Sequence, residues 1–106
     1  MATYTTTSDF SDLVGSMVVT NSNNDVDSYT SNTLGAGTVT NTPGKNTLEF
    51  TVSFGKDGQL YTIDANANAS GNGYSGEAKN GLPTGDEEPW SATASTAETA
   101  TQKAAH

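Results

Sequence analysis

The 106-residue sequence has no cysteine, no arginine and a single histidine. Without cysteine the chain can form no disulfide and offers no thiol nucleophile. Zinc and haem sites draw mainly on cysteine and histidine, so neither is expected. The one histidine, His106, is the last residue, where packing would not hold it against a serine or an acid. No G-x-S-x-G elbow or P-loop is present. We therefore expect no enzyme activity, no catalytic residue and no cofactor.

Basic side chains are also scarce. Four lysines stand against 12 acidic residues, and the formal net charge is −8 at pH 7. Such a chain cannot neutralise a run of phosphates, so nucleic-acid binding is not expected, and docking on an anionic membrane is disfavoured for the same reason. The acidic surface either keeps the protein soluble or recognises a cationic partner.

Large aliphatic and phenyl side chains are few, with five Leu, one Ile, six Val and three Phe. This predicts a folded but thin core, completed by a protein partner or by self-association. No apolar run approaches the roughly 18 residues of a membrane-spanning helix, so no membrane insertion is expected. The first residues lack the basic and apolar regions of a signal peptide. Abundant Thr, Asn, Ser and Gly favour an extracellular, cell-surface or virion location.

Polar and apolar residues alternate along most of the chain, which predicts β-strands. The clearest strand is LEFTVSF at 48–54, with its four large apolar residues on one face. Further strands are predicted at 13–20, 26–39, 60–70, 74–79 and around Trp90. Gly35–Gly37 predicts a bend or bulge, and Asn72-Gly73 predicts a two-residue hairpin turn.

Tight turns join these strands and no crossover helix is visible. The pattern predicts an all-β fold, an antiparallel meander of six to eight strands, with a small barrel favoured over a sandwich. We expect a single all-β domain over residues 1–95. Ser95-Thr96-Ala97-Glu98 has the spacing of a helix-capping box, so residues 96–106 are predicted to form a short C-terminal helix or a mobile tail.

Oxygen-bearing side chains recur at alternate positions in DANANAS, residues 64–70, as in a calcium loop or on the wet face of a strand. A helix-loop-helix calcium loop needs Gly at its sixth position and Glu at its twelfth, where this chain has Ala69 and Ser75. We therefore predict a strand, with Ala65, Ala67 and Ala69 packed beneath a bulky side chain such as Trp90.

A second oxygen cluster is a weak candidate for calcium binding. It consists of Asn23, Asp25 and Asp27, in a segment whose alternative is an Asx-rich hairpin turn. No other metal ligands are proposed.

Three adjacent acids, Asp86, Glu87 and Glu88, precede Pro89-Trp90. Paired carboxylates beside an aromatic residue occur in glycoside hydrolases, but adjacent acids in a Gly- and Pro-rich loop are typical of a solvated turn. Trp90 either belongs to the core or contacts a partner. These four residues are the candidate partner contacts.

Two fragments between residues 47 and 80 resemble transferrin-binding-protein-type surface β-barrels of bacteria. Phe50-Thr51-Val52-Ser53-Phe54-Gly55 is similar to their "F-x-V-D-F-G" strand end. Further along the chain, Ser70-Gly71-Asn72-Gly73-Tyr74-Ser75-Gly76-Glu77-Ala78 is similar to the hairpin that follows this strand in those barrels. The resemblance implies an antiparallel meander that binds host proteins or helps to acquire iron, without catalysis.

These observations favour a non-enzymatic all-β binding or interaction module, exposed on a cell surface or secreted. The alternative is a structural virion component, such as a phage decoration protein, because assembly would complete a thin core.

Overall fold

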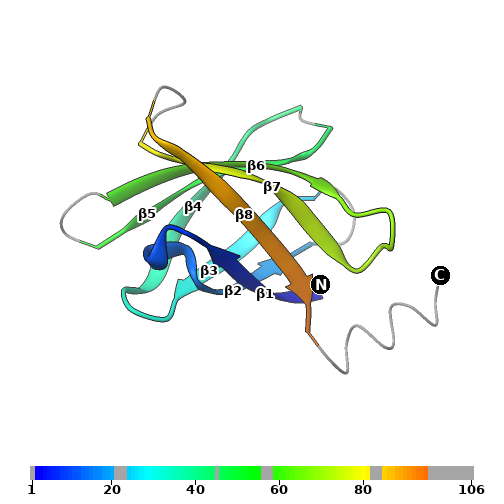
Figure 1. Cartoon of the computed structure of the whole chain (residues 1–106), viewed down its shortest axis with the longest axis horizontal. Helices are drawn as coiled ribbons and strands as arrows, with labels where there is room; N and C mark the ends of the chain where they lie inside the picture. Colours follow the sequence, from blue (N-terminus) through cyan, green and yellow to red (C-terminus); the bar gives the residue numbers. More distant parts are fainter. Residues whose placement is uncertain (1, 21–23, 45, 56–58, 82–84, 96–106) are drawn as a thin grey trace.

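The computed structural model describes residues 2–20, 24–44, 46–55, 59–81 and 85–95, and these form eight strands and one short 3-10 turn (Figure 1). In chain order they are β1 (Ala2–Ser8), η1 (Ser11–Leu13), β2 (Gly15–Val19), β3 (Val26–Ser31), β4 (Gly35–Asn41), β5 (Leu48–Phe54), β6 (Gln59–Ala67), β7 (Gly73–Asn80) and β8 (Glu87–Ala94). The C-terminal segment 96–106, predicted to be a helix or a tail, lies outside the described residues.

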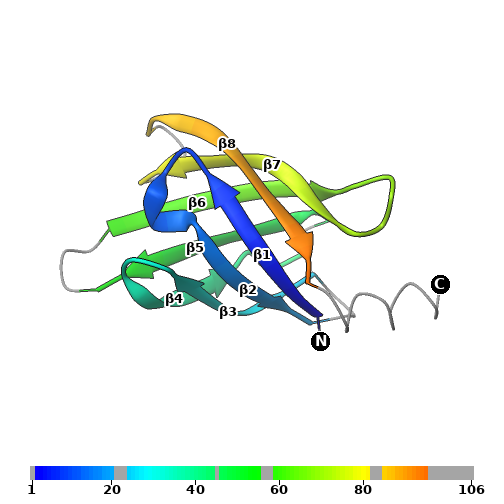
Figure 2. The same cartoon turned by 60° about the horizontal axis from the view of Figure 1, so that its bottom comes forward.

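Each strand pairs antiparallel with the next, and β8 returns to pair with β1, from Tyr4 opposite Ala94 to Ser8 opposite Trp90. The sheet is therefore a closed barrel with strand order β1 to β8 (Figure 2). This confirms the predicted all-β meander and the barrel. No helix in the described part of the chain is long and apolar enough to cross a membrane.

The inward faces of the strands form one hydrophobic core. The alternation predicted for 48–54 is confirmed, because Leu48, Phe50, Val52 and Phe54 are at most 1% exposed. Burying each such side chain contributes about 1.5–3 kcal/mol. Rings fill the interior, with the centroid of Phe50 6.0 Å from that of Tyr29 and 6.2 Å from that of Trp90.

A buried hydrogen-bond network lies within this core. The Trp90 Nε1–H donates to the Tyr29 hydroxyl at 3.0 Å, and the Tyr29 hydroxyl donates to the Leu13 carbonyl at 2.6 Å. The Thr6 hydroxyl donates to the same carbonyl at 2.8 Å. The network joins β1, β3 and β8 to η1, and no buried side-chain nitrogen or oxygen of the described residues lacks a partner.

The turn η1 closes one end of the barrel. Its Leu13 side chain is fully buried, and Asp12 accepts a hydrogen bond from the Tyr61 hydroxyl of β6 at 2.7 Å. The Phe10 ring packs on the Tyr61 ring, with 5.3 Å between centroids. Burial, and then the hydrogen bond to the Asp12 carboxylate and its negative charge, raise the pKa of Tyr61 to about 12.

The DANANAS stretch is a strand only in part. Ala65 of β6 is fully buried, between Leu48 and Gly76 in the register of the sheet. However, β6 ends at Ala67, and both Ala67 and Ala69 are exposed. The prediction that all three alanines lie under a bulky side chain is therefore wrong for two of them. The hairpin between β6 and β7 projects beyond the barrel wall, so alternation there no longer corresponds to burial (Figure 1).

Two turn predictions also need correction. The segment 26–39 is two strands joined by a tight turn at 32–34, rather than one strand with a bend at Gly35–Gly37. Gly35 follows this turn with φ of +82°, which favours glycine. The hairpin after β6 is longer than a two-residue turn at Asn72-Gly73, because Ala67 pairs with Tyr74 and Gly73 already belongs to β7.

Candidate functional site

Acidic side chains of three neighbouring strands lie in one row. Glu49 of β5 is directly opposite Asp64 of β6, and Asp64 is directly opposite Glu77 of β7. Their neighbours Leu48, Phe50 and Ala65 point into the core, so strand alternation places these carboxylates on the outer surface. Like charges directly opposite one another destabilise a sheet. Folding therefore does not favour this row, which makes it a candidate for function.

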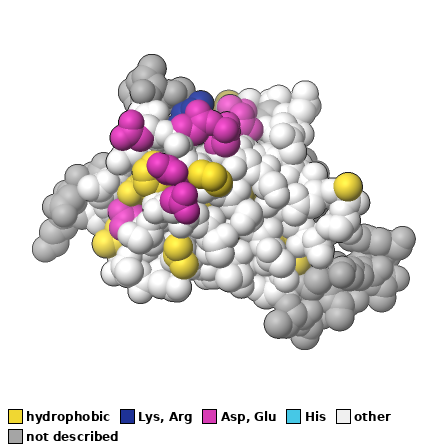
Figure 3. Space-filling view, viewed as in Figure 1, with side chains coloured by type: hydrophobic (Ala, Val, Ile, Leu, Met, Phe, Trp, Pro, Cys, Tyr) yellow, Lys and Arg dark blue, Asp and Glu magenta, His cyan; other side chains and the backbone are white. Residues whose placement is uncertain are grey.

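The row continues onto β8. Hydrogen bonding to the nearby Glu87 carboxyl, followed by the negative charge of Glu87, raises the pKa of Glu77. Lys79, opposite Glu87 in the register, lowers that pKa by a smaller amount. Lys79 is the only basic side chain among the described residues. Figure 3 shows a group of acidic side chains (magenta) with a basic side chain (dark blue) beside it.

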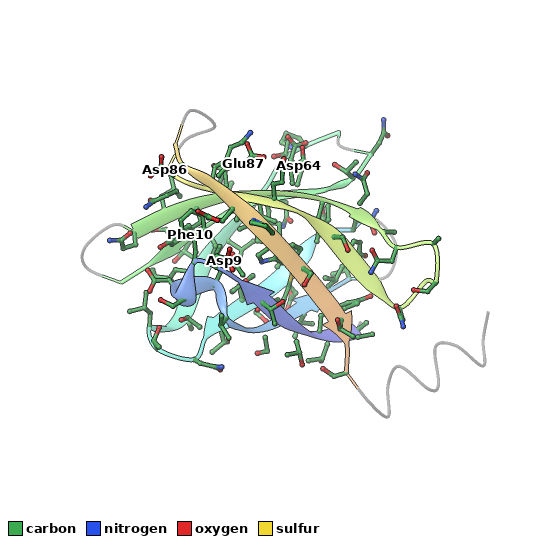
Figure 4. All side chains as sticks on the ribbon, viewed as in Figure 1. Asp9, Phe10, Asp64, Asp86 and Glu87 are labelled. Atoms are coloured by element: carbon green, nitrogen blue, oxygen red, sulfur yellow. The ribbon has the colours of Figure 1, made fainter. Side chains whose placement is uncertain are left out.

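We call this surface the acidic face. Its members are Glu49, Asp64, Glu77 and Glu87, with Asp86 at its end next to Glu87. Figure 4 labels Asp64, Asp86 and Glu87 among them. It contains a shallow concavity of about 520 Å³, bordered by Glu49, Asp64, Glu77 and Lys79. A second concavity of about 440 Å³ adjoins it at Glu77 and is bordered by Glu87 and Glu88. The acidic face is thus a hollowed surface dominated by negative charge.

The candidate partner contacts from the sequence divide into two groups. Asp86 and Glu87 are exposed at the acidic face, whereas Glu88 is half-buried, borders the second concavity and lies on the same side of β8 as the buried Trp90. Glu87 and Glu88 are not in a loop as predicted, because β8 begins at Glu87 and pairs with β7. Trp90 is only 2% exposed, so the structure shows core packing for this residue, and its side chain offers no surface to a partner.

The weak calcium candidates lie elsewhere. Asn23 is outside the described residues, and Asp27 is exposed on β3. The Asp25 main-chain carbonyl accepts hydrogen bonds from the backbone N–H and the hydroxyl of Thr20. The described residues contain no group of three or more His, Cys, Asp or Glu that could hold a metal ion.

The row of Glu49, Asp64 and Glu77 was not among the predicted contacts. Alternation alone places each of these residues on the outside of its strand. Only the register brings them opposite one another, and the register across a hairpin depends on the length of its loop. The predicted two-residue turn at Asn72-Gly73 is shorter than the observed loop, so it does not place Glu77 opposite Asp64.

The acidic face can attract and hold positive charge, since several carboxylates share a concave surface with one lysine. No model of a protein family matches the chain, and no curated protein or solved structure matches it.

Proposed function

We propose that the protein is a non-enzymatic binding module, exposed on a cell surface or secreted, whose acidic face binds a cationic surface of a protein partner. The observation that carries the proposal is the row of Glu49, Asp64 and Glu77 in direct cross-strand register. This row costs the isolated protein electrostatic free energy, and a partner with lysines or arginines in the concavity would offset that cost.

The interior of the barrel supports binding on the outside rather than transport of a small molecule inside. Tyr29, Phe50, Phe54 and Trp90 occupy the interior and are at most 2% exposed. Their rings pack against one another with centroids about 6 Å apart. A ligand inside the barrel would have to displace these side chains.

The second candidate function is a structural role in an assembly such as a virion. It is favoured by β4, which has no charged and no buried residue and so leaves an uncharged strand exposed on the barrel wall. The resemblance to transferrin-binding-protein-type barrels stays a prediction that agrees with the first candidate.

The first candidate can be tested with a lysine-rich peptide as the probe, by measuring its affinity for paired variants. Asp64→Asn with Glu77→Gln removes two charges from the acidic face. Asp25→Asn with Asp27→Asn removes two charges elsewhere, so both variants have the same net charge. We expect the first pair to weaken binding about fivefold or more, and the control pair less than twofold.

Equal losses in the two paired variants would contradict the proposal, because they would show attraction to net charge rather than to this face. Binding should also weaken as salt is added, since exposed charges are screened over about 8–10 Å at physiological ionic strength. Affinity that does not depend on salt would contradict a charge-based contact.

A further inference from the structure

One short motif outside the acidic face has a specific chemical meaning. Asn68-Ala69-Ser70 has the pattern of an N-glycosylation acceptor, which is Asn, then any residue except proline, then Ser or Thr. None of the other nine asparagines in the chain has serine or threonine at the second position after it. Such a short pattern becomes informative where the fold places it in an accessible surface loop.

The motif lies in the hairpin between β6 and β7, just beyond the end of β6. Ala67, Ala69 and Ser70 are exposed there, and Asn68 is half-buried. The hairpin projects past the barrel wall and turns back with Gly71 at φ of +78° (Figure 1). Asn68 does not belong to the hydrophobic core. A sugar attached at this hairpin can therefore extend into solvent without displacing a core side chain.

The hydrogen bonds of Asn68 hold the residue in place and leave its amide nitrogen free to react. Its backbone N–H donates to the Gly73 carbonyl at 2.8 Å, and its backbone carbonyl accepts from the Gly71 N–H at 2.9 Å. Its side-chain Oδ1 accepts from the Ser75 hydroxyl at 2.7 Å. Nδ2, the atom to which an N-linked sugar is attached, has no hydrogen bond to any other described residue.

We propose that Asn68 is an N-glycosylation site, which rests on the proposed exposure on a cell surface or secretion, here through a eukaryotic secretory route. The co-substrate is an oligosaccharide joined to a polyprenyl pyrophosphate. Nδ2 of Asn68 forms a bond to C1 of the first sugar, and the bond between C1 and the pyrophosphate oxygen breaks. The pyrophosphate leaves with the electron pair and the amide loses one proton, so no oxidant or reductant is needed.

The position of the glycan relative to the acidic face follows from Ser75. This residue contacts Asn68, and together with Asn66 it also borders the larger concavity. A glycan on Asn68 would therefore lie at the edge of the acidic face nearest the hairpin and would leave its carboxylates unmodified. Binding of a lysine-rich peptide to the deglycosylated protein then tests the first proposal separately, so the two proposals can fail independently.

Expression of the full chain in eukaryotic cells, behind an added cleavable secretion leader, tests the glycosylation site. Electrophoretic mobility is compared before and after digestion with an amidase that releases N-glycans, for both the secreted and the retained protein. The wild type should show one shifted band that digestion removes, and peptide mass should show Asp in place of Asn68 after release. Asn68→Gln and Ser70→Ala should each abolish the shift, whereas Ser70→Thr should retain it.

Asn66→Gln is the matched control, because it removes an exposed asparagine of the same segment and leaves the motif intact, so it should shift like the wild type. Ser70→Ala keeps both Asn68 and Ser75, so loss of the glycan in this variant reflects the motif rather than the hairpin. Two results would overturn the proposal. They are a wild-type protein whose leader is cleaved but whose Asn68 is unmodified, and a shift that persists in Asn68→Gln.

Discussion

At the scale of single residues, Glu77 links stability to pH. Hydrogen bonding to the Glu87 carboxyl, and then the negative charge of Glu87, raise the pKa of Glu77. The folded state therefore holds a proton on Glu77 more tightly than the unfolded chain does. The stability linked to Glu77 is fully present below the unfolded pKa and is lost as the pH rises through the native pKa.

Replacing Glu77 with Gln should remove this pH dependence. At about pH 7 we expect Glu77→Gln to raise the midpoint temperature of unfolding by a few degrees or less, because it removes the repulsion from Glu87 and Asp64. The advantage over the wild type should shrink as the solution is acidified. Calorimetry at several pH values measures it, with Asp27→Asn as an exposed control. A gain that is constant at every pH would contradict this account.

At the scale of elements, β4 depends on the absence of a side chain at Gly37. A Cβ atom at this position would lie 2.6 Å from Cγ2 of Val52 and 2.8 Å from Cε1 of Phe54. Gly37 is directly opposite Phe54 in the register, so the Phe54 ring packs over the glycine. The glycine that suggested a bend in the sequence is thus needed for contact between two strands.

We expect Gly37→Ala to destabilise the protein by about 1–3 kcal/mol, because the added methyl group overpacks the core against Phe54 and Val52. Ala36→Ser, at the exposed neighbouring position, should change the stability by less than about 0.5 kcal/mol. Denaturant unfolding of both variants measures the difference. If Gly37→Ala were as stable as the wild type, Phe54 would have to move easily, and the packing described here would be wrong.

At the scale of the whole molecule, β3 and β4 share the fewest paired residues of any two neighbouring strands in the barrel wall. Their contact has two residue pairs, whereas each of the other strand contacts has five to seven. At the far end of this contact, the side-chain amide of Asn41 takes the place of a backbone pair. Asn41 Oδ1 accepts from the Val26 N–H at 2.8 Å, and Nδ2 donates to the Val26 carbonyl at 3.0 Å.

Asn41→Asp keeps the acceptor but removes the donor. We expect it to cost about 1–3 kcal/mol, since the Val26 carbonyl loses its partner. We also expect amide hydrogen exchange to become faster in β3 and β4 than in β7 and β8. Asn32→Asp, at an exposed turn position, makes the same change of charge as a control. Uniformly faster exchange in all strands would contradict local opening at this contact.

Much of the fold follows from local pattern. The row from Leu48 to Phe54 alternates with period two, and the structure buries the predicted face. The acidic face was less accessible to prediction. Asp86, Glu87 and Glu88 were recognised because they are adjacent in the chain, whereas Glu49, Asp64 and Glu77 are separated by loops whose lengths determine the register. The burial of Trp90 depended in the same way on which strands meet across the interior.

The sequence alone determined an all-β meander, the inward face of its clearest strand, the excess of acidic residues, the absence of cysteine and arginine, and the position of the only histidine at residue 106. These properties depend on composition and on neighbours within a few residues. Only the tertiary structure decided that β8 pairs with β1 and that three carboxylates oppose one another. Those features depend on register and closure, which bring together residues that are distant in the chain.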